Sequence, residues 1–177
     1  MASKMETLFT IGYEAASIED FLATLKAAGI TKLVDIRELP ASRRKGFSKN
    51  ALAEALYGIG IDYVHLKGLG DPKPGREAAR AGEFGKFEKI FLEHMASSRA
   101  KADLELAVSL AQQGGACLFC YERDHQHCHR KYVAEAMSSI INLHTRHLGV
   151  REGLASNGRK IRARKNARDG EGASPSR

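Results

Sequence analysis

Charged, thiol and imidazole side chains gather at the ends of two apolar stretches of this sequence, around positions 32–36 and 116–121. They are Asp35, Arg37, Glu122, Cys128, His129 and Arg130. Carboxylates can transfer protons as general acids or bases, and arginines bind phosphate and carboxylate groups through paired N–H donors. These residue types therefore predict a site that binds an anionic ligand and carries out acid–base chemistry on it.

We predict catalytic roles for Asp35, Glu122 and Cys128. Asp35 or Glu122 would act as the acid or the base. Cys128 stands at the start of an expected helix, whose N-terminus favours a thiolate nucleophile. His129 is a poor partner base for it, because adjacent helical residues point apart. Structural roles are open as well: Asp35 can cap the following turn, and Cys128 can be a buried apolar side chain.

We predict that Arg37, His129 and Arg130 bind the ligand. Arg130 falls in the first turn of the expected helix, where the helix dipole disfavours a cation, so its presence indicates a bound anion or an acidic partner. An arginine beside a helix N-terminus is a good receptor for a phosphate group. The alternatives are a surface salt bridge for Arg130 and a structural ion pair of Arg37 with Asp35 or Glu38.

Three cysteines lie close together in the sequence, at positions 117, 120 and 128. Cys117 and Cys120 have the spacing of a redox or zinc pair, but residues three apart on a strand point to opposite faces, which argues against both roles. Zinc would accept Cys120, Cys128 and the histidines at 125, 127 and 129, yet the second pair of ligands typical of zinc fingers and ribbons is missing. We therefore predict no cofactor and no metal ligand, and keep zinc as an alternative.

The alternation of apolar stretches with helical patterns predicts an α/β fold. We expect strands at 8–11, 32–36, 61–65, 116–121 and 142–148, and helices beginning after Ser17 and Ser48 and spanning 84–95, 100–113 and 128–141. The uniformly apolar run at 116–121 is typical of a central parallel strand covered on both faces. Residues 66–82 hold two prolines and several glycines, and we expect them to form a long loop.

Strands that alternate with helices predict a single small Rossmann-like domain, with a mainly parallel sheet of about four or five strands flanked by helices. Ligands of such sheets bind beyond the carboxyl ends of the strands. Those ends hold Asp35, Arg37, His65 and Glu122, so this topology would bring the candidate residues to one edge. The sequence carries no dinucleotide or P-loop fingerprint that would narrow the ligand.

The charge is unevenly spread along the chain, whose formal net charge is +7. Residues 151–177 hold eight Lys/Arg against three Asp/Glu, which leaves 20 against 18 for residues 1–150. We predict one domain over residues 1–150 and a basic, disordered tail over 151–177. The sequence has no apolar run as long as a membrane span, and its first residues do not lead into an apolar signal segment. We therefore expect a cytoplasmic protein with reduced thiols and no membrane partner.

Several short motifs together resemble one protein family. They are Thr10-Ile-Gly-Tyr13, Asp35-x-Arg37, Cys120-x-Glu122 and Cys128-His-Arg130. In that order they are similar to the bacterial and archaeal family known as domain of unknown function 488, over residues 7–148 or so. The resemblance implies a small Rossmann-like α/β domain and places positions 35, 37, 120, 122, 128, 129 and 130 in the family pattern, but it implies no established reaction. The basic residues after position 151 fall outside the pattern.

Our leading hypothesis is an enzyme that binds a phosphate-bearing ligand, either a nucleotide or a nucleic acid, and cleaves it by hydrolysis or at a glycosidic bond. Arg37 and Arg130 would hold the phosphate, and Asp35 or Glu122 would transfer the proton. The alternative is a non-catalytic module that senses a nucleotide or nucleic acid with the same arginines, with salt-dependent affinity added by the tail. A second alternative is a thiol or metal protein that uses the cysteines at 120 and 128 with nearby histidines.

Overall fold

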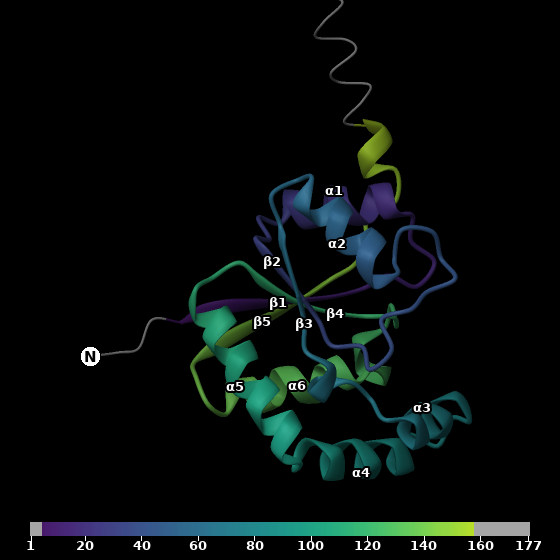
Figure 1. The fold of residues 1–177 in the computed structure, drawn as a ribbon, viewed down its shortest axis with the longest axis vertical. Helices are drawn as coiled ribbons and strands as arrows, with labels where there is room; N and C mark the ends of the chain where they lie inside the picture. The colour runs from purple at the N-terminus through teal and green to yellow at the C-terminus, as the bar shows by residue number, and fades with distance from the viewer. Residues whose placement is uncertain (1–4, 158–177) are drawn as a thin grey trace, which may run out of the picture.

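The computed structural model of this chain describes residues 5–157. Within that range, five parallel strands form one sheet in the order β3-β2-β4-β1-β5, with helices on both faces (Figure 1). The strands are β1 Glu6–Gly12, β2 Lys32–Asp35, β3 Asp62–His65, β4 Ala116–Cys120 and β5 Leu143–Leu148. The helices are α1 Ile18–Ala27, α2 Lys49–Tyr57, α3 Lys73–Arg80, α4 Phe84–Met95, α5 Ser98–Gln112 and α6 His129–Ser138, with 3-10 turns at Lys67–Leu69 and His125–His127. The predicted α/β class and parallel sheet are confirmed.

Strand β4 lies at the centre of the sheet, between β2 and β1. All five of its residues are buried, as its uniformly apolar sequence predicted, because helices cover both of its faces. Helix α1 begins where expected: Ser17 is its N-cap, and the Ser17 hydroxyl accepts a hydrogen bond from the backbone N–H of Asp20 at 3.2 Å.

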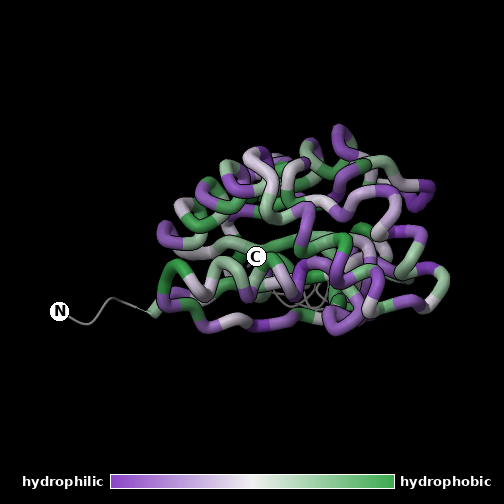
Figure 2. Tube along the Cα trace, turned by 90° about the horizontal axis from the view of Figure 1, so that it is seen from below, coloured by the Kyte–Doolittle hydropathy of each residue, from purple (hydrophilic) through white to green (hydrophobic). Residues whose placement is uncertain are grey.

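The sheet separates two hydrophobic cores. Helices α1 and α2 cover one face, and α3, α4, α5 and α6 lie on the other (Figure 1). The first core includes Phe21, Leu25, Leu52 and Phe119, and the second includes Phe91, Leu118, Val133 and Met137. Each such side chain stabilises the fold by about 1.5–3 kcal/mol through burial. Hydrophobic stretches run through the interior and hydrophilic ones lie mostly at the margin (Figure 2).

The prediction of a long loop at residues 66–82 was wrong. The segment forms the 3-10 turn Lys67–Leu69 and the helix α3. Pro72 is the N-cap of α3 and Pro74 lies in its first turn, where the lack of a backbone N–H costs no helical hydrogen bond. Ala78 of α3 is buried in the second core, so tertiary packing stabilises a helix that a proline-rich sequence did not suggest.

Residues 151–157, the start of the predicted tail, contact α1. The backbone N–H of Gly153 and that of Ala155 donate to the two carboxylate oxygens of Asp20 at 2.9 and 3.0 Å, and the N–H of Arg151 donates to Thr24 Oγ1 at 3.0 Å. The remainder of the predicted tail, 158–177, lies outside the described residues. In the part of the chain that is described, no helix is both long enough and apolar enough to cross a membrane.

Candidate functional site

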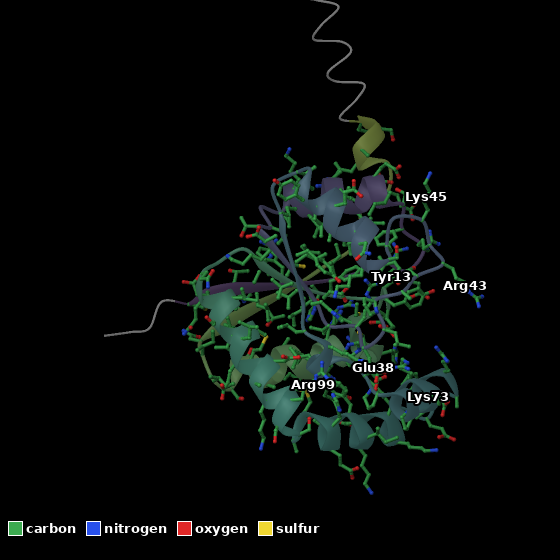
Figure 3. The ribbon with its side chains drawn as sticks, in the orientation of Figure 1. Tyr13, Glu38, Arg43, Lys45, Lys73 and Arg99 are labelled. Carbon is green, nitrogen blue, oxygen red and sulfur yellow. The ribbon has the colours of Figure 1, made fainter. Side chains whose placement is uncertain are left out.

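A cleft of about 1090 Å³ opens at the carboxyl edge of the sheet. One wall comes from the ends of β1 and β4, and the others come from the segment after β2 and from α3. Its lining includes Tyr13, Arg37, Asp71, Arg76, Glu122 and His129. Figure 3 shows Tyr13 on the inner side of this edge and Arg43 extending outward from the segment after β2. The cleft therefore lies where parallel α/β sheets bind their ligands.

Asp35 and Arg37 form a buried ion pair at the end of β2, with exposed fractions of 0% and 6%. Arg37 Nη2 donates to Asp35 Oδ2 at 2.7 Å, and Arg37 Nε donates to Asp35 Oδ1 at 2.9 Å. The hydroxyl of Tyr63 donates a hydrogen bond to the same Oδ2 at 2.6 Å. Both carboxylate oxygens are thus occupied, and Asp35 lies behind the cleft wall to which Arg37 belongs.

The guanidinium of Arg37 is held from further sides. Its Nη1 donates to the carbonyl oxygen of Phe47 at 2.8 Å and to the hydroxyl of Tyr13 at 3.2 Å. The guanidinium carbon of Arg37 lies 4.7 Å from the ring centre of Phe119. Burial lowers the pKa of Arg37, but its bonds to Asp35 outweigh this and raise the pKa overall. Arg37 is a fixed positive charge in the cleft wall.

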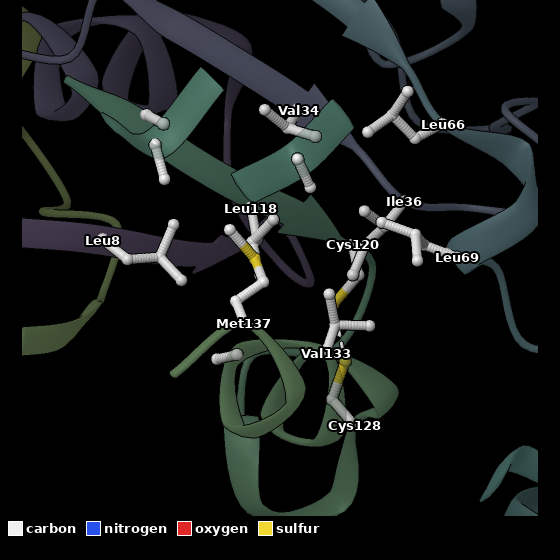
Figure 4. Close-up of a cluster of buried hydrophobic side chains, with 14 of the residues drawn as sticks. Leu8, Val34, Ile36, Leu66, Leu69, Leu118, Cys120, Cys128, Val133 and Met137 are labelled. Atoms are coloured by element: carbon white, nitrogen blue, oxygen red, sulfur yellow. Dashed lines mark hydrogen bonds between the residues drawn. The ribbon is translucent and has the colours of Figure 1, made fainter. Parts of the chain in front are cut away.

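Glu122 lies two residues after β4 and belongs to a hydrogen-bonded group with two thiols. Cys128 donates to Glu122 Oε2 at 3.1 Å, and the Sγ atoms of Cys120 and Cys128 lie 2.7 Å apart (Figure 4). Burial raises the pKa of Glu122, but the positive charge of the His129 ring in its protonated form, the backbone N–H of Glu122 itself and the two thiols outweigh it, so the pKa lies below the usual value. Glu122 is therefore ionised at neutral pH.

The backbone at Glu122 approaches the end of β1 so closely that only glycine fits there. A Cβ at Gly12 would lie 1.7 Å from the carbonyl oxygen of Glu122 and 2.9 Å from Arg130 Nη1. Gly12 thus permits the approach that sets the position of the Glu122 segment.

Arg130 lies on α6 and is 1% exposed. Its guanidinium donates to Cys120 Sγ at 2.7 Å, to the carbonyl oxygens of Glu122 and Arg123, and to Thr10 Oγ1 at 3.2 Å. Protein atoms thus engage Nε, Nη1 and Nη2, and Arg130 holds the segment between β4 and α6 from behind the cleft. The cation at this helix start is explained by these internal acceptors.

His129 is buried in the cleft wall beside Cys128. Its Nε2 lies 2.9 Å from the carbonyl oxygen of Ile36, which can only accept, so the proton is assigned to Nε2. Nδ1 then carries a lone pair, 3.8 Å from Cys128 Sγ. Burial lowers the pKa of His129 and raises that of Cys128, so both side chains are neutral at pH 7.

Asp71 is a buried carboxyl group in the same cleft that the sequence analysis missed. Its Oδ1 has no hydrogen-bond partner among the described residues. Burial and the negative charge of Glu122 raise its pKa to about 7, an effect that Arg76 partly opposes and Glu38 reinforces. A Cβ at Gly75 would lie 2.0 Å from Oδ1, so this glycine leaves room for the carboxyl group. The sequence signal was an acidic residue between glycine and proline just before a helix, hidden within the segment predicted to be a loop.

The structure gathers some of the predicted residues and separates others. Cys128, His129 and Arg130 meet Cys120 and Glu122 at the start of α6. As predicted, Cys117 lies on the opposite face of β4 from Cys120, in the other core. The predicted cluster of cysteines with three histidines is divided: the ring of His125 stacks on His147 at 3.6 Å, and that of His127 lies against Phe84 at 4.6 Å.

The thiols of Cys120 and Cys128 and a carboxylate oxygen of Glu122 all lie within 4.8 Å of one another. Among residues 5–157 these are the side chains grouped closely enough to hold a metal ion. Two thiolates and a carboxylate are ligands that zinc accepts.

A family model described as domain of unknown function DUF488 matches residues 17–137, more than half of the chain. The chain belongs to this family. The matched part of this DUF488 protein contains Asp35, Arg37, Glu122, Cys128, His129 and Arg130 as well as Asp71, and the predicted family is confirmed. Comparison with curated proteins and with solved structures finds no match.

Proposed function

We propose that this DUF488 protein is an enzyme that cleaves a phosphate-bearing substrate by general acid–base catalysis, with Asp71 as the acid and Glu122 as the base. The observation that carries the proposal is a pair of carboxyl groups in one cleft whose pKa values are pushed apart. That of Asp71 is raised to about 7, and that of Glu122 is lowered. Such a pair supplies a proton donor and a proton acceptor at the same pH.

The reaction would be a hydrolysis. Glu122 takes a proton from water as the water oxygen attacks, the scissile bond breaks, and Asp71 gives its proton to the leaving atom. Arg37, fixed in the cleft wall, would attract the phosphate group of the substrate. Water added to the two fragments balances the step, and no redox partner is required.

The other candidate residues would position this pair. Asp35 orients Arg37, and Arg130 orients the Glu122 backbone. Cys128 would donate its hydrogen bond to Glu122 and act as a positioning group instead of a nucleophile, because burial raises its pKa and keeps the thiol protonated.

The test is turnover of nucleotides, phosphosugars and short oligonucleotides, followed by mass spectrometry of the products. Asp71→Asn and Glu122→Gln should each lower turnover about 10²- to 10⁴-fold. Asp62→Asn and Glu105→Gln are matched controls, because both carboxylates are exposed and away from the cleft. Wild-type turnover in both cleft variants would refute the acid–base pair. A ligand that binds and is returned unchanged would favour the sensing module.

A second candidate is a metal protein, favoured by the grouping of Cys120, Glu122 and Cys128 within 4.8 Å. Zinc would need both thiols to lose their protons and their sulfur atoms to move apart, because tetrahedral zinc ligands stand about 3.5–3.8 Å from one another. The two candidates exclude each other, since a carboxylate bound to zinc cannot also accept the proton. Metal analysis of protein purified without added zinc decides between them: one ion per chain supports the metal protein, and sub-stoichiometric metal removes it.

A further inference from the structure

Two large aromatic side chains are exposed in the wall of the cleft. Tyr121 is 47% exposed and Phe84 is 45% exposed. Tyr121 meets Tyr13 at a ring distance of 5.3 Å, and Tyr13 is itself fixed by stacking on Phe47 at 4.4 Å. These rings offer apolar surface inside a cleft that is otherwise strongly charged.

Two cations line the same cleft and have no ion-pair partner among the described residues. Arg43, in the segment after β2, and Arg80, in the last turn of α3, are exposed, and neither forms an ion pair with any residue in the described part of the chain. Arg76 differs, because Glu38 and the carbonyl oxygen of Asp71 already engage it. Exposed guanidinium groups at a cleft bind phosphate oxygens well.

We propose that the substrate is a single-stranded nucleic acid, with bases stacked on Tyr121 and Phe84 and phosphates bound by Arg43 and Arg80. The inference rests on the proposed function, because it names the substrate class of the same cleft. Aromatic rings combined with arginines are the means by which proteins bind unpaired strands. In a duplex the bases stack on one another and cannot offer their faces to these rings.

The size of the cleft and the charge of the chain agree with this substrate. Pockets for single small ligands span about 300–1,000 Å³, and this cleft, at about 1090 Å³, has room for more than one nucleotide. The chain has a formal net charge of +7, which favours association with a polyanion, and residues 151–177 carry +5 of it.

The experiment is fluorescence anisotropy of the full chain with a labelled single-stranded oligonucleotide of mixed sequence, at several salt concentrations. A duplex of the same sequence and the free mononucleotides serve as competitors. Tyr121→Ala and Phe84→Ala should each weaken binding about 5- to 100-fold. Arg43→Ala and Arg80→Ala should each reduce the slope of log affinity against log salt by about one.

Two substitutions outside the cleft serve as matched controls. Tyr57, on α2, is 86% exposed, and Arg99, on α5, is exposed and is not among the residues that line the cleft. Tyr57→Ala and Arg99→Ala should leave binding of the single strand unchanged. Thermal unfolding of each variant establishes that it is folded.

We expect tight binding of the single strand, with competition by duplex and by mononucleotide at least tenfold weaker. The affinity for the single strand should fall in the cleft variants alone. Equal binding of duplex, full competition by a mononucleotide, or unchanged binding in both aromatic variants would each overturn the inference. A wild type that binds the strand without cleaving it contradicts the acid–base proposal alone, and a wild type that cleaves another phosphate ester without binding the strand contradicts this inference alone.

Discussion

The thiol of Cys128 donates a hydrogen bond to Oε2 of Glu122 across 3.1 Å. The bond joins the N-cap of α6 to a residue two positions beyond the end of the central strand, so the start of a helix helps to set the charge state of a carboxylate in the cleft. Burial raises the pKa of Glu122, and this thiol is one of the groups, after His129, that bring it below its usual value.

Substitution of Cys128 should therefore change the pH dependence of the reaction. In Cys128→Ala the carboxylate loses a donor, so the pKa of Glu122 should rise and the acidic limb of the pH–rate profile should move to higher pH. The profile of kcat/KM between pH 3 and 9 or so measures this shift. Cys117→Ala is the control, because that thiol is equally buried but on the other face of β4. An acidic limb that stays in place would show that the thiol does not tune Glu122.

Asp71 should make the free energy of unfolding depend on pH. Its pKa is about 7 in the folded state and 3.8 in the unfolded chain, so the folded state binds the extra proton between these values. This contribution is fully present below about pH 4 and is lost as the pH rises toward and past 7. Asp71→Asn should remove this loss. The free energy of unfolding of the variant, relative to that of the wild type, should therefore be about 1–3 kcal/mol higher at pH 8 than at pH 4.

Urea unfolding of wild type and Asp71→Asn at pH 4, 6 and 8 or so measures this difference. Asp62→Asn is the control, because Asp62 is exposed. Parallel pH profiles for wild type and Asp71→Asn would contradict the raised pKa.

Gly12→Ala should destabilise the protein and displace the Glu122 segment. Its Cβ would lie 1.7 Å from the carbonyl oxygen of Glu122, so the backbone must move, at a cost of about 2–4 kcal/mol. Denaturant unfolding measures the loss, and turnover should fall with it. Gly85→Ala, on α4, is the matched control, because its Cβ would meet no atom within 4 Å and should be neutral or slightly stabilising. Equal stability of the two variants would refute the close approach.

Loss of Asp35 should be more damaging than loss of Tyr63. Asp35→Ala leaves the guanidinium of Arg37 buried without its counter-ion, which costs about 3–5 kcal/mol. Tyr63→Phe removes one hydrogen bond to the same carboxylate and should cost about 1–2 kcal/mol. Thermal and denaturant unfolding compare the two. A cost for Asp35→Ala no larger than that for Tyr63→Phe would show that the ion pair contributes little to the fold.

Much of the fold could be predicted because its signals are local. The apolar run of β4, the Ser17 cap of α1 and the alternation of strands with helices each depend on a few neighbouring residues. Helix α3 was missed because the prolines at its N-cap and in its first turn are typical of a loop. Its stability comes from packing against residues far away in the chain.

The sequence alone determined the fold class, and it named residues that do meet, because parallel topology brings the ends of β2 and β4 to one edge. Only the tertiary structure decided which charges face the cleft. Asp35 and Arg130 are residue types that are common in binding sites, yet both are engaged by internal partners. Asp71, in contrast, is buried in the same cleft as Glu122, and its Oδ1 has no hydrogen-bond partner among the described residues. The physical reason is that burial and unpaired charge arise from surroundings assembled by several distant segments, and no short stretch of sequence contains them.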